Sequence, residues 1–387
     1  MKRLLLVIAI LYFTADSFAQ SRQQLTSSEI LQGMEKLNVV GSVLYIAAHP
    51  DDENTRLLAY LSKEKKLRTG YLSLTRGDGG QNLVGKEQAE LLGLIRTQEL
   101  LAARRIDGAE QFFSRANDFG YSKNPEETFS IWKKDTILSD MVWIIRNFKP
   151  DVIICRFPTT GEGGHGHHTA SAILAMEAFS AAADPTRFAW QLKSTDTWQV
   201  KRIFWNTFNF GTTNTTSPDQ LQIDVGGFNT LLGKSYGEIA AESRSMHKSQ
   251  GFGSAKSRGE QIEFFKQLKG DSVKTGIFEN IDQSWNRLGN LSYIINQVNS
   301  CIENFNVKDP SKSISTLKLI RNSLLSLPEH NKEIVYWKKI KLKEVEDLMV
   351  NCAGLWLEAS ANNYSGIPGK QTEITAQMIN RSDAIVK

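Results

Sequence analysis

The stretch V-L-Y-I-A-A-H-P-D-D-E at residues 43–53 decides the fold. Its first five residues, 43–47, form an uninterrupted apolar run, which predicts a strand that is buried on both faces, as strands of parallel sheets are. His49 and three acidic residues, 51–53, follow at the carboxyl end of that strand. In open α/β sheets, ligands bind in the crevice beyond the carboxyl ends of the strands. The stretch therefore predicts a parallel sheet together with a ligand-binding loop.

Short apolar runs alternate with longer helical patterns from residue 43 to about residue 205, which indicates an α/β protein with a parallel sheet covered by helices. We expect the strands at residues 43–47, 70–75, 152–157 and 201–205, and the helices at residues 54–65, 87–105, 135–148 and 169–182. After about residue 270 the pattern changes to helices alone. These helical stretches are expected at residues 282–304, 309–325 and 329–352.

The last part of the chain, residues 354–387, alternates in polarity with period two around a Pro-Gly turn, which predicts two strands. Two strands alone do not make a stable domain. Either they add to the main body or they are the start of a truncated β-sandwich. We therefore divide the chain into a signal peptide at 1–19, a catalytic α/β domain at 20–270, a helical region at 271–353 and a β-rich segment at 354–387.

The first 19 residues have the three parts of a secretory signal peptide. Lys2 and Arg3 precede an apolar run at residues 4–13, and Ser17-Phe18-Ala19 provides a cleavage site of small residues. The apolar run is shorter than the roughly 20 residues that a membrane-spanning helix needs. We expect a periplasmic or secreted protein with no stable membrane span after cleavage.

The charge and the number of cysteines bear on nucleic-acid binding and on disulfide bonds. The chain has 46 Lys and Arg against 42 Asp and Glu, a formal net charge of +4, without a dominant basic run, so we do not expect nucleic-acid binding. Three cysteines are too few for a disulfide framework in a chain of 387 residues, although Cys301 and Cys352 could pair. Cys155 lies in an apolar run and is most simply a core residue. The sequence does not determine the oligomeric state.

A second polar cluster, G-E-G-G-H-G-H-H-T at residues 161–169, follows the expected strand at 152–157. Four of the six histidines fall in this loop and in the first one, namely His49, His165, His167 and His168. Histidines with a carboxylate are ligands of divalent metals, and a site of three such ligands leaves a position open for water, which is the catalytic arrangement of zinc. Metal binding lowers the pKa of that water to about 7, so a neighbouring Asp can act as its general base.

These motifs resemble those of the PIG-L/LmbE-like family of zinc-dependent deacetylases, which act on N-acetylglucosamine-type amino sugars. The resemblance rests on A-H-P-D-D-E at 48–53, H-x-x-H at 165–168, L-T-R-G at 74–77 and the histidine-containing run at 243–250. It extends over about residues 40–255. It implies a Rossmann-like three-layer α/β/α sandwich with a mostly parallel sheet, here followed by the helical region and the short β-rich segment.

The resemblance also implies roles for individual residues. Asp51 is similar to the general base, and His165 to a histidine that, as an imidazolium, steadies the oxyanion or protonates the leaving amine. The family often has Asp just before its last ligand, where this chain has His167, so the ligand is either that residue or the next one. Motif spacing favours the next one. The implied ligands of Zn²⁺ or another divalent metal are His49, Asp52 and His168.

Three further residues are candidates for substrate binding. Arg76 could bind a sugar hydroxyl or form a surface salt bridge, Asp78 could bind a hydroxyl or serve as a turn residue, and His247 could reach the site or be structural. The resemblance implies hydrolysis of an N-acetyl amide on an amino sugar or glycoconjugate. The alternatives are another metal-dependent amide or ester hydrolase, and a non-catalytic carbohydrate-binding protein.

Overall fold

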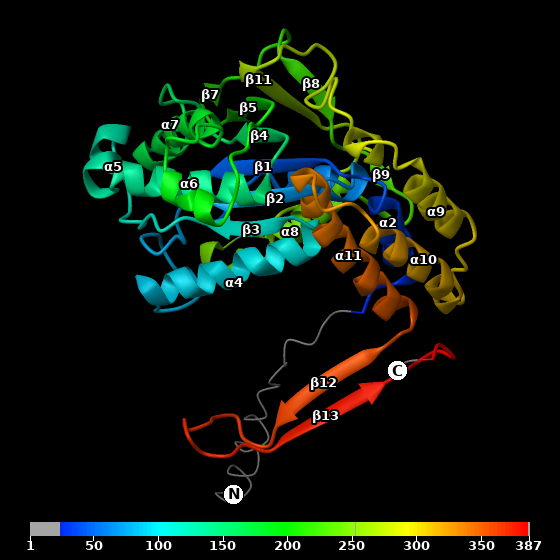
Figure 1. The fold of residues 1–387 in the computed structure, drawn as a ribbon. Helices are drawn as coiled ribbons and strands as arrows, with labels where there is room; N and C mark the ends of the chain where they lie inside the picture. Colours follow the sequence, from blue (N-terminus) through cyan, green and yellow to red (C-terminus); the bar gives the residue numbers. More distant parts are fainter. Residues whose placement is uncertain (1–23, 252, 386–387) are drawn as a thin grey trace, which may run out of the picture.

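The computed structural model describes residues 24–251 and 253–385, so the expected signal peptide at 1–19 lies outside the described residues. Its centre is a seven-stranded sheet with the order β3-β2-β1-β4-β5-β11-β8 (Figure 1). The strands are β1 (Ser42–Ala47), β2 (Arg68–Ser73), β3 (Glu110–Phe113), β4 (Val152–Cys155), β5 (Arg202–Thr207), β8 (Leu221–Asp224) and β11 (Ile262–Gly270). The first five are parallel to one another, and β11 runs antiparallel to β5 and β8. The predicted mostly parallel sheet is confirmed.

Helices cover both faces of the sheet, which confirms the three-layer arrangement. One face packs against α5 (Pro125–Ile131), α6 (Lys134–Phe148) and α7 (Gly166–Ala181), and the other against α3 (Thr55–Ala59) and α4 (Glu90–Asp107). The helix α8 (Tyr236–Arg244) packs in turn on α3 and α4. Side chains of β1 alternate between the two cores: Leu44 and Ile46 enter the first, and Val43 and Tyr45 the second. The apolar run that predicted burial on both faces therefore sits at the centre of the sheet.

The helix expected at residues 54–65 is interrupted. It consists of α3, which ends at Ala59, and a π-helical turn at Tyr60–Glu64. Two short ribbons were not expected from the sequence. They are formed by β6 (Asn209–Phe210) with β7 (Thr213–Asn214), and by β9 (Phe228–Asn229) with β10 (Lys234–Ser235).

The helical region has a core of its own. The helices α9 (Ser292–Glu303), α10 (Ile314–Leu325) and α11 (Lys332–Cys352) pack around Trp285 and Trp337 together with α2 (Ser27–Lys36). The sequence had not linked α2 to this region. Arg287 connects this core to the sheet through two hydrogen bonds to the buried carboxylate of Asp151, at 2.8 and 2.9 Å. Among the described helices, none is long and apolar enough to cross a membrane.

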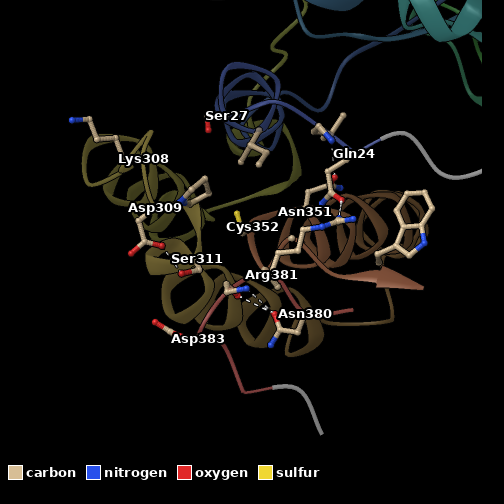
Figure 2. Close-up of a pocket in the computed structure, with 17 residues that line it drawn as sticks. Gln24, Ser27, Lys308, Asp309, Ser311, Asn351, Cys352, Asn380, Arg381 and Asp383 are labelled. Atoms are coloured by element: carbon tan, nitrogen blue, oxygen red, sulfur yellow. Dashed lines mark hydrogen bonds between the residues drawn. The ribbon is translucent and has the colours of Figure 1, made fainter. Parts of the chain in front are cut away.

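The β-rich segment is a hairpin of β12 (Trp356–Ala361) and β13 (Ile374–Ile379), which extends away from the body (Figure 1). In the described part of the chain its strands pair only with each other, so they do not add to the main sheet. A pocket of about 940 Å³ lies at its base, between the start of α2 and residues 380–383, and none of the candidate site residues line it (Figure 2).

The three cysteines are buried free thiols, so the disulfide considered for Cys301 and Cys352 is not formed. Burial raises the pKa of all three thiols, to about 12 for Cys155, about 11 for Cys301 and about 12 for Cys352. They therefore behave as core residues.

Candidate metal centre

Both histidine loops lie at the carboxyl edge of the sheet, beside its central strands. β1 lies between β2 and β4, so the chain leaves it toward β2 on one side and later returns to β4 on the other. This change of direction opens the crevice in which α/β proteins bind ligands. His49 follows β1, and the loop with His165 follows β4 and leads into α7. The ring centroids of these two histidines are 5.1 Å apart.

Three side chains form a group that can hold a metal ion. The ligand atoms of His49, Asp52 and His168 lie within 4.8 Å of one another. Asp52 lies between the two rings, with its Oδ2 at 3.1 Å from Nδ1 of His49 and its Oδ1 at 3.5 Å from Nε2 of His168. Burial works to raise the pKa of Asp52, but His168 and His49 outweigh it and hold that pKa well below its usual range. The group thus presents one carboxylate and two imidazoles, a set that fits a divalent ion such as zinc.

The orientation of His168 is fixed by its neighbours. Its Nδ1 donates to the carbonyl oxygen of Gly163 at 2.8 Å, which leaves Nε2 free to accept on the side of Asp52. The ring of Phe157 stacks on it, with the centroids 3.7 Å apart. The structure thus places His168, rather than His167, in the group with Asp52.

Asp51 has an unusual backbone. Its φ of 99° lies in the region that favours glycine, and an observed outlier of this kind is typical of functional sites. Its N–H donates to Glu53 at 2.9 Å, and its carbonyl accepts from Arg244. Burial and the neighbouring charge of Asp52 raise the pKa of Asp51 to about 7. Both Asp51 and Asp52 line a pocket of about 930 Å³.

His165 is the N-cap of α7, and its Nδ1 accepts a hydrogen bond from the backbone N–H of His167 at 3.1 Å. Burial, together with His49 and His168, lowers the pKa of His165 to about 4. Its surroundings therefore favour a neutral imidazole, not the imidazolium that the resemblance implies. Because Nδ1 accepts, the proton of the neutral ring lies on Nε2.

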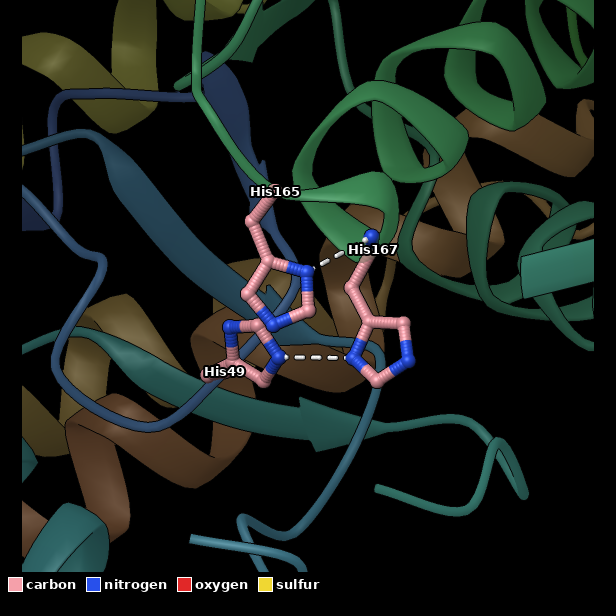
Figure 3. Close-up of side chains that lie close together, drawn as sticks. All are labelled: His49, His165 and His167. Carbon is pink, nitrogen blue, oxygen red and sulfur yellow. Dashed lines mark hydrogen bonds between the residues drawn. The ribbon is translucent and has the colours of Figure 1, made fainter. Parts of the chain in front are cut away.

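His167 is fully buried, and burial followed by the charge of His49 lowers its pKa to about 2. With His49 and His165 it forms a second group of nitrogen atoms within 4.8 Å (Figure 3). The sequence placed His167 beside the site but assigned it no role other than that of alternative ligand.

A buried charge network supports the first loop. Glu53 is 2% exposed and accepts hydrogen bonds from Arg104 at 3.1 Å and from His247 at 2.8 Å. Burial works to raise the pKa of Glu53, but His247 and Arg104 outweigh it and lower that pKa to about 2. Arg104 also binds the buried Asp107. The sequence motif contains Glu53, yet nothing in the sequence indicated its partners.

The three candidates for substrate binding lie outside the lining of this pocket. Arg76 points toward α4 and β3, where it donates to Thr97 at 3.0 Å and stacks on Phe113 at 4.2 Å. Asp78 lies against α4, close to Gly93. His247 is fully buried against Glu53, so it supports the loop rather than facing the pocket.

The pocket wall includes residues that the sequence analysis did not single out. Arg156 lies over the ring of Phe208 at 5.1 Å, and Phe210, on the β6–β7 ribbon, is 80% exposed at the rim. Elsewhere in the pocket wall, Glu263 on β11 and Arg56 on α3 form an ion pair of 3.8 Å. No pattern of alternation marks the short ribbon, which is why its aromatic residues were missed.

Part of the chain matches a known protein family and its relatives. Residues 44–179 match the family model described as PIG-L: GlcNAc-PI de-N-acetylase. The chain is 27% identical over 193 residues to 1D-myo-inositol 2-acetamido-2-deoxy-alpha-D-glucopyranoside deacetylase of Streptomyces scabiei, covering 44% of this chain and 58% of that protein. It is 28% identical over 159 residues to mycothiol S-conjugate amidase of Streptomyces coelicolor, covering 38% and 54%.

The chain spans between about half and just under two thirds of the length of the curated relatives that it matches first. Among solved structures, N,N'-diacetylchitobiose deacetylase from Pyrococcus horikoshii matches with a TM-score of 0.44 and 18% identity, over 64% of this chain and 88% of that one. Residues 44–179, the part that matches the PIG-L family model, hold both histidine loops.

Proposed function

We propose that this protein is a metal-dependent N-deacetylase that hydrolyses the N-acetyl amide of an amino sugar or glycoconjugate. The observation that carries the proposal is that Asp51 lines the same pocket as Asp52 and His168, two of the three residues of the group that can hold a metal. A binding protein has no need of a base next to a metal site. The relatives are named as deacetylases and an amidase, which supports an amide as the bond that is hydrolysed.

The residues present fit zinc. His49, Asp52 and His168 would hold it, and their nitrogen and oxygen donors are the types that zinc takes in catalytic sites. When bound, the ion would make water acidic enough to lose a proton at neutral pH and would polarise the acetyl carbonyl.

The side chains around this group have separate tasks. Asp51 takes the proton of the attacking water, and its backbone is held in place by Arg244 and Glu53. His165 has its Nε2–H available to donate to the oxygen that becomes negative, since its Nδ1 already accepts from the backbone of α7.

The pocket and the N-terminus support a glycan substrate. Aromatic rings of Phe157, Phe208 and Phe210 line the pocket together with charged groups, a combination that suits a sugar ring with hydroxyl groups. The signal-peptide pattern at residues 1–19 supports export to the periplasm or the outside, where such glycoconjugates occur.

The test is acetate release from a panel of N-acetylglucosamine-containing compounds, with zinc, with a chelator, and after zinc is added back. We expect release that the chelator abolishes and zinc restores. Asp51→Asn should lower kcat by about 10²- to 10⁴-fold, as expected for loss of a general base, while the zinc content stays unchanged. Asp271→Asn, an exposed carboxylate, is the matched control.

Two outcomes would contradict the proposal. Release of phosphate or of an alcohol, but not of acetate, from a wider panel would indicate another metal-dependent hydrolase. Glycan binding without turnover, unchanged in Asp51→Asn, would indicate a carbohydrate-binding protein.

A further inference from the structure

His167 is a fully buried histidine to which the proposed reaction gives no task. Its ring is enclosed by Trp132, stacked at 4.7 Å between centroids, and by the edge-on ring of Phe119 at 4.4 Å. Its Nδ1 lies 2.9 Å from Nε2 of His49, and a dashed line marks this contact in Figure 3. A buried polar contact of this length is a hydrogen bond, so one of these two nitrogens carries a proton and the other accepts it.

The other ring nitrogen of His49, Nδ1, faces Asp52 at 3.1 Å, on the side of the metal group. Two tautomers of the neutral ring therefore compete. With the proton on Nδ1, the ring donates to Asp52, and its lone pair lies on Nε2, which faces His167. With the proton on Nε2, the ring donates to His167 and its Nδ1 is free to bind metal.

Hydrogen bonds link the three residues of the second group, His49, His165 and His167. The first and last of them share a proton, and Nδ1 of His165 accepts from the backbone N–H of His167. His167 thus contacts His49 through its ring and His165 through its backbone N–H.

We propose that His167 is a positioning residue, which accepts the Nε2 proton of His49 and so keeps Nδ1 of His49 available to the metal. Outer hydrogen bonds of this kind fix the tautomer of histidine ligands in metal sites. The inference rests on the metal centre of the proposed function, but not on its substrate. It goes beyond that function because it explains why a second imidazole is buried behind the first.

Two substitutions of His167 distinguish the effect of its accepting nitrogen from the effect of the packing of its ring. In His167→Asn, the amide oxygen stands close to the place of Nδ1 and can still accept from His49. In His167→Leu, the volume is similar but no acceptor remains. Both variants lose the imidazole that packs between Trp132 and Phe119, so a merely structural role would affect both alike. His330→Leu, at an exposed position of the helical region, is the control.

The readouts are the tautomer of His49 in the metal-free protein, from ¹⁵N NMR of the labelled histidines, and the zinc affinity, from competition with a chelator. We expect Nε2–H for His49 in wild type and His167→Asn, and a population of Nδ1–H in His167→Leu. Zinc affinity should fall by about 10- to 100-fold in His167→Leu and by only a few fold in His167→Asn.

Three results would overturn the inference. The first is a wild-type zinc affinity and tautomer in His167→Leu. The second is an equal loss of affinity in both variants. The third is binding of two zinc ions per wild-type chain and one per His167→Leu chain, which would make His167 a ligand of its own ion. None of these results depends on acetate release, so a failure of the proposed activity is seen separately.

Discussion

Arg104 is the cation on which two buried carboxylates depend. Its side chain is 4% exposed and lies 3.1 Å from Glu53, directly behind the first metal loop, and 2.6 Å from Asp107. Both carboxylates are fully enclosed, so their charges cannot be solvated by water when the partner is lost. The network therefore couples the stability of the fold to the position of the loop that holds Asp51 and Asp52.

We expect Arg104→Met to lower the free energy of unfolding by about 3–5 kcal/mol, because it leaves buried charge uncompensated. Arg115→Met is the matched control: 66% of this arginine side chain is accessible, so the loss of its ion pair with Asp140 should leave the free energy of unfolding close to wild type. Urea unfolding of both variants measures the difference. Equal, small losses would mean that the network adds nothing to stability.

The thiols give a second prediction about single residues. Because burial raises the pKa of Cys155, Cys301 and Cys352, native protein at pH 8 should react with none of its three cysteines when treated with a thiol reagent. After denaturation without reductant, all three should react, since no disulfide joins them. Only one reactive thiol after denaturation would show that Cys301 and Cys352 pair.

At the scale of elements, the start of α7 is the most constrained junction of the site. Gly166 is the first residue of that helix, and a Cβ on it would lie 2.3 Å from the backbone oxygen of Asn124 and from the hydroxyl of Ser122. Its own N–H donates to the oxygen of Ser122 at 2.8 Å. The close approach fixes the end of the helix that carries His165, His167 and His168.

Gly166→Ala should therefore destabilise the protein by about 1–3 kcal/mol, because the extra methyl group forces the loop and helix apart. In an unconstrained helix the same change would stabilise by up to about 1 kcal/mol. Zinc affinity should fall as well, since the histidines move with the helix. Gly276→Ala, where nothing lies within 4 Å of the added Cβ, should leave both thermal unfolding and zinc affinity close to wild type. Unchanged zinc affinity in Gly166→Ala would contradict this account.

The elements differ in how well the sequence predicts them. β1 and β4 are buried on both faces, so their apolar runs are unambiguous. β3 has one exposed and three half-buried residues, and β11 mixes buried, half-buried and exposed positions. Both strands lie at or near an edge of the sheet, and their sequences mix charged with apolar residues. The start of α2 did have a readable signal, because Thr26 and Glu29 form a capping box.

The same distinction holds within the site. The two histidine loops could be placed from sequence because each follows a strand of the sheet. The direction of Arg76 could not, since it is set by packing against Thr97 and Phe113. His167 and Glu53 act through partners more than 50 positions away in the chain, at His49, Arg104 and His247, and only the folded chain brings those partners together.

At the scale of the whole molecule, the helical region and the hairpin differ in how they are attached. The helical region shares its core with α2, and Arg287 neutralises the buried Asp151 at the start of β4. The hairpin is almost wholly exposed, including large apolar side chains such as Leu357 and Met378. A hydrogen bond from Arg381, which follows β13, to Gln24 links this segment to the residues before α2.

Deleting residues 354–387 should therefore change the free energy of unfolding by under about 1 kcal/mol, because little apolar surface is lost from any core. Acetate release should be unaffected, and solubility should rise as exposed apolar residues are removed.

Deleting residues 271–387 should instead give aggregated protein, since the apolar face of α2 and the carboxylate of Asp151 lose their partners. Calorimetry and size-exclusion chromatography distinguish the two deletions. A cooperative, soluble protein after the longer deletion would show that the sheet folds without the helical region.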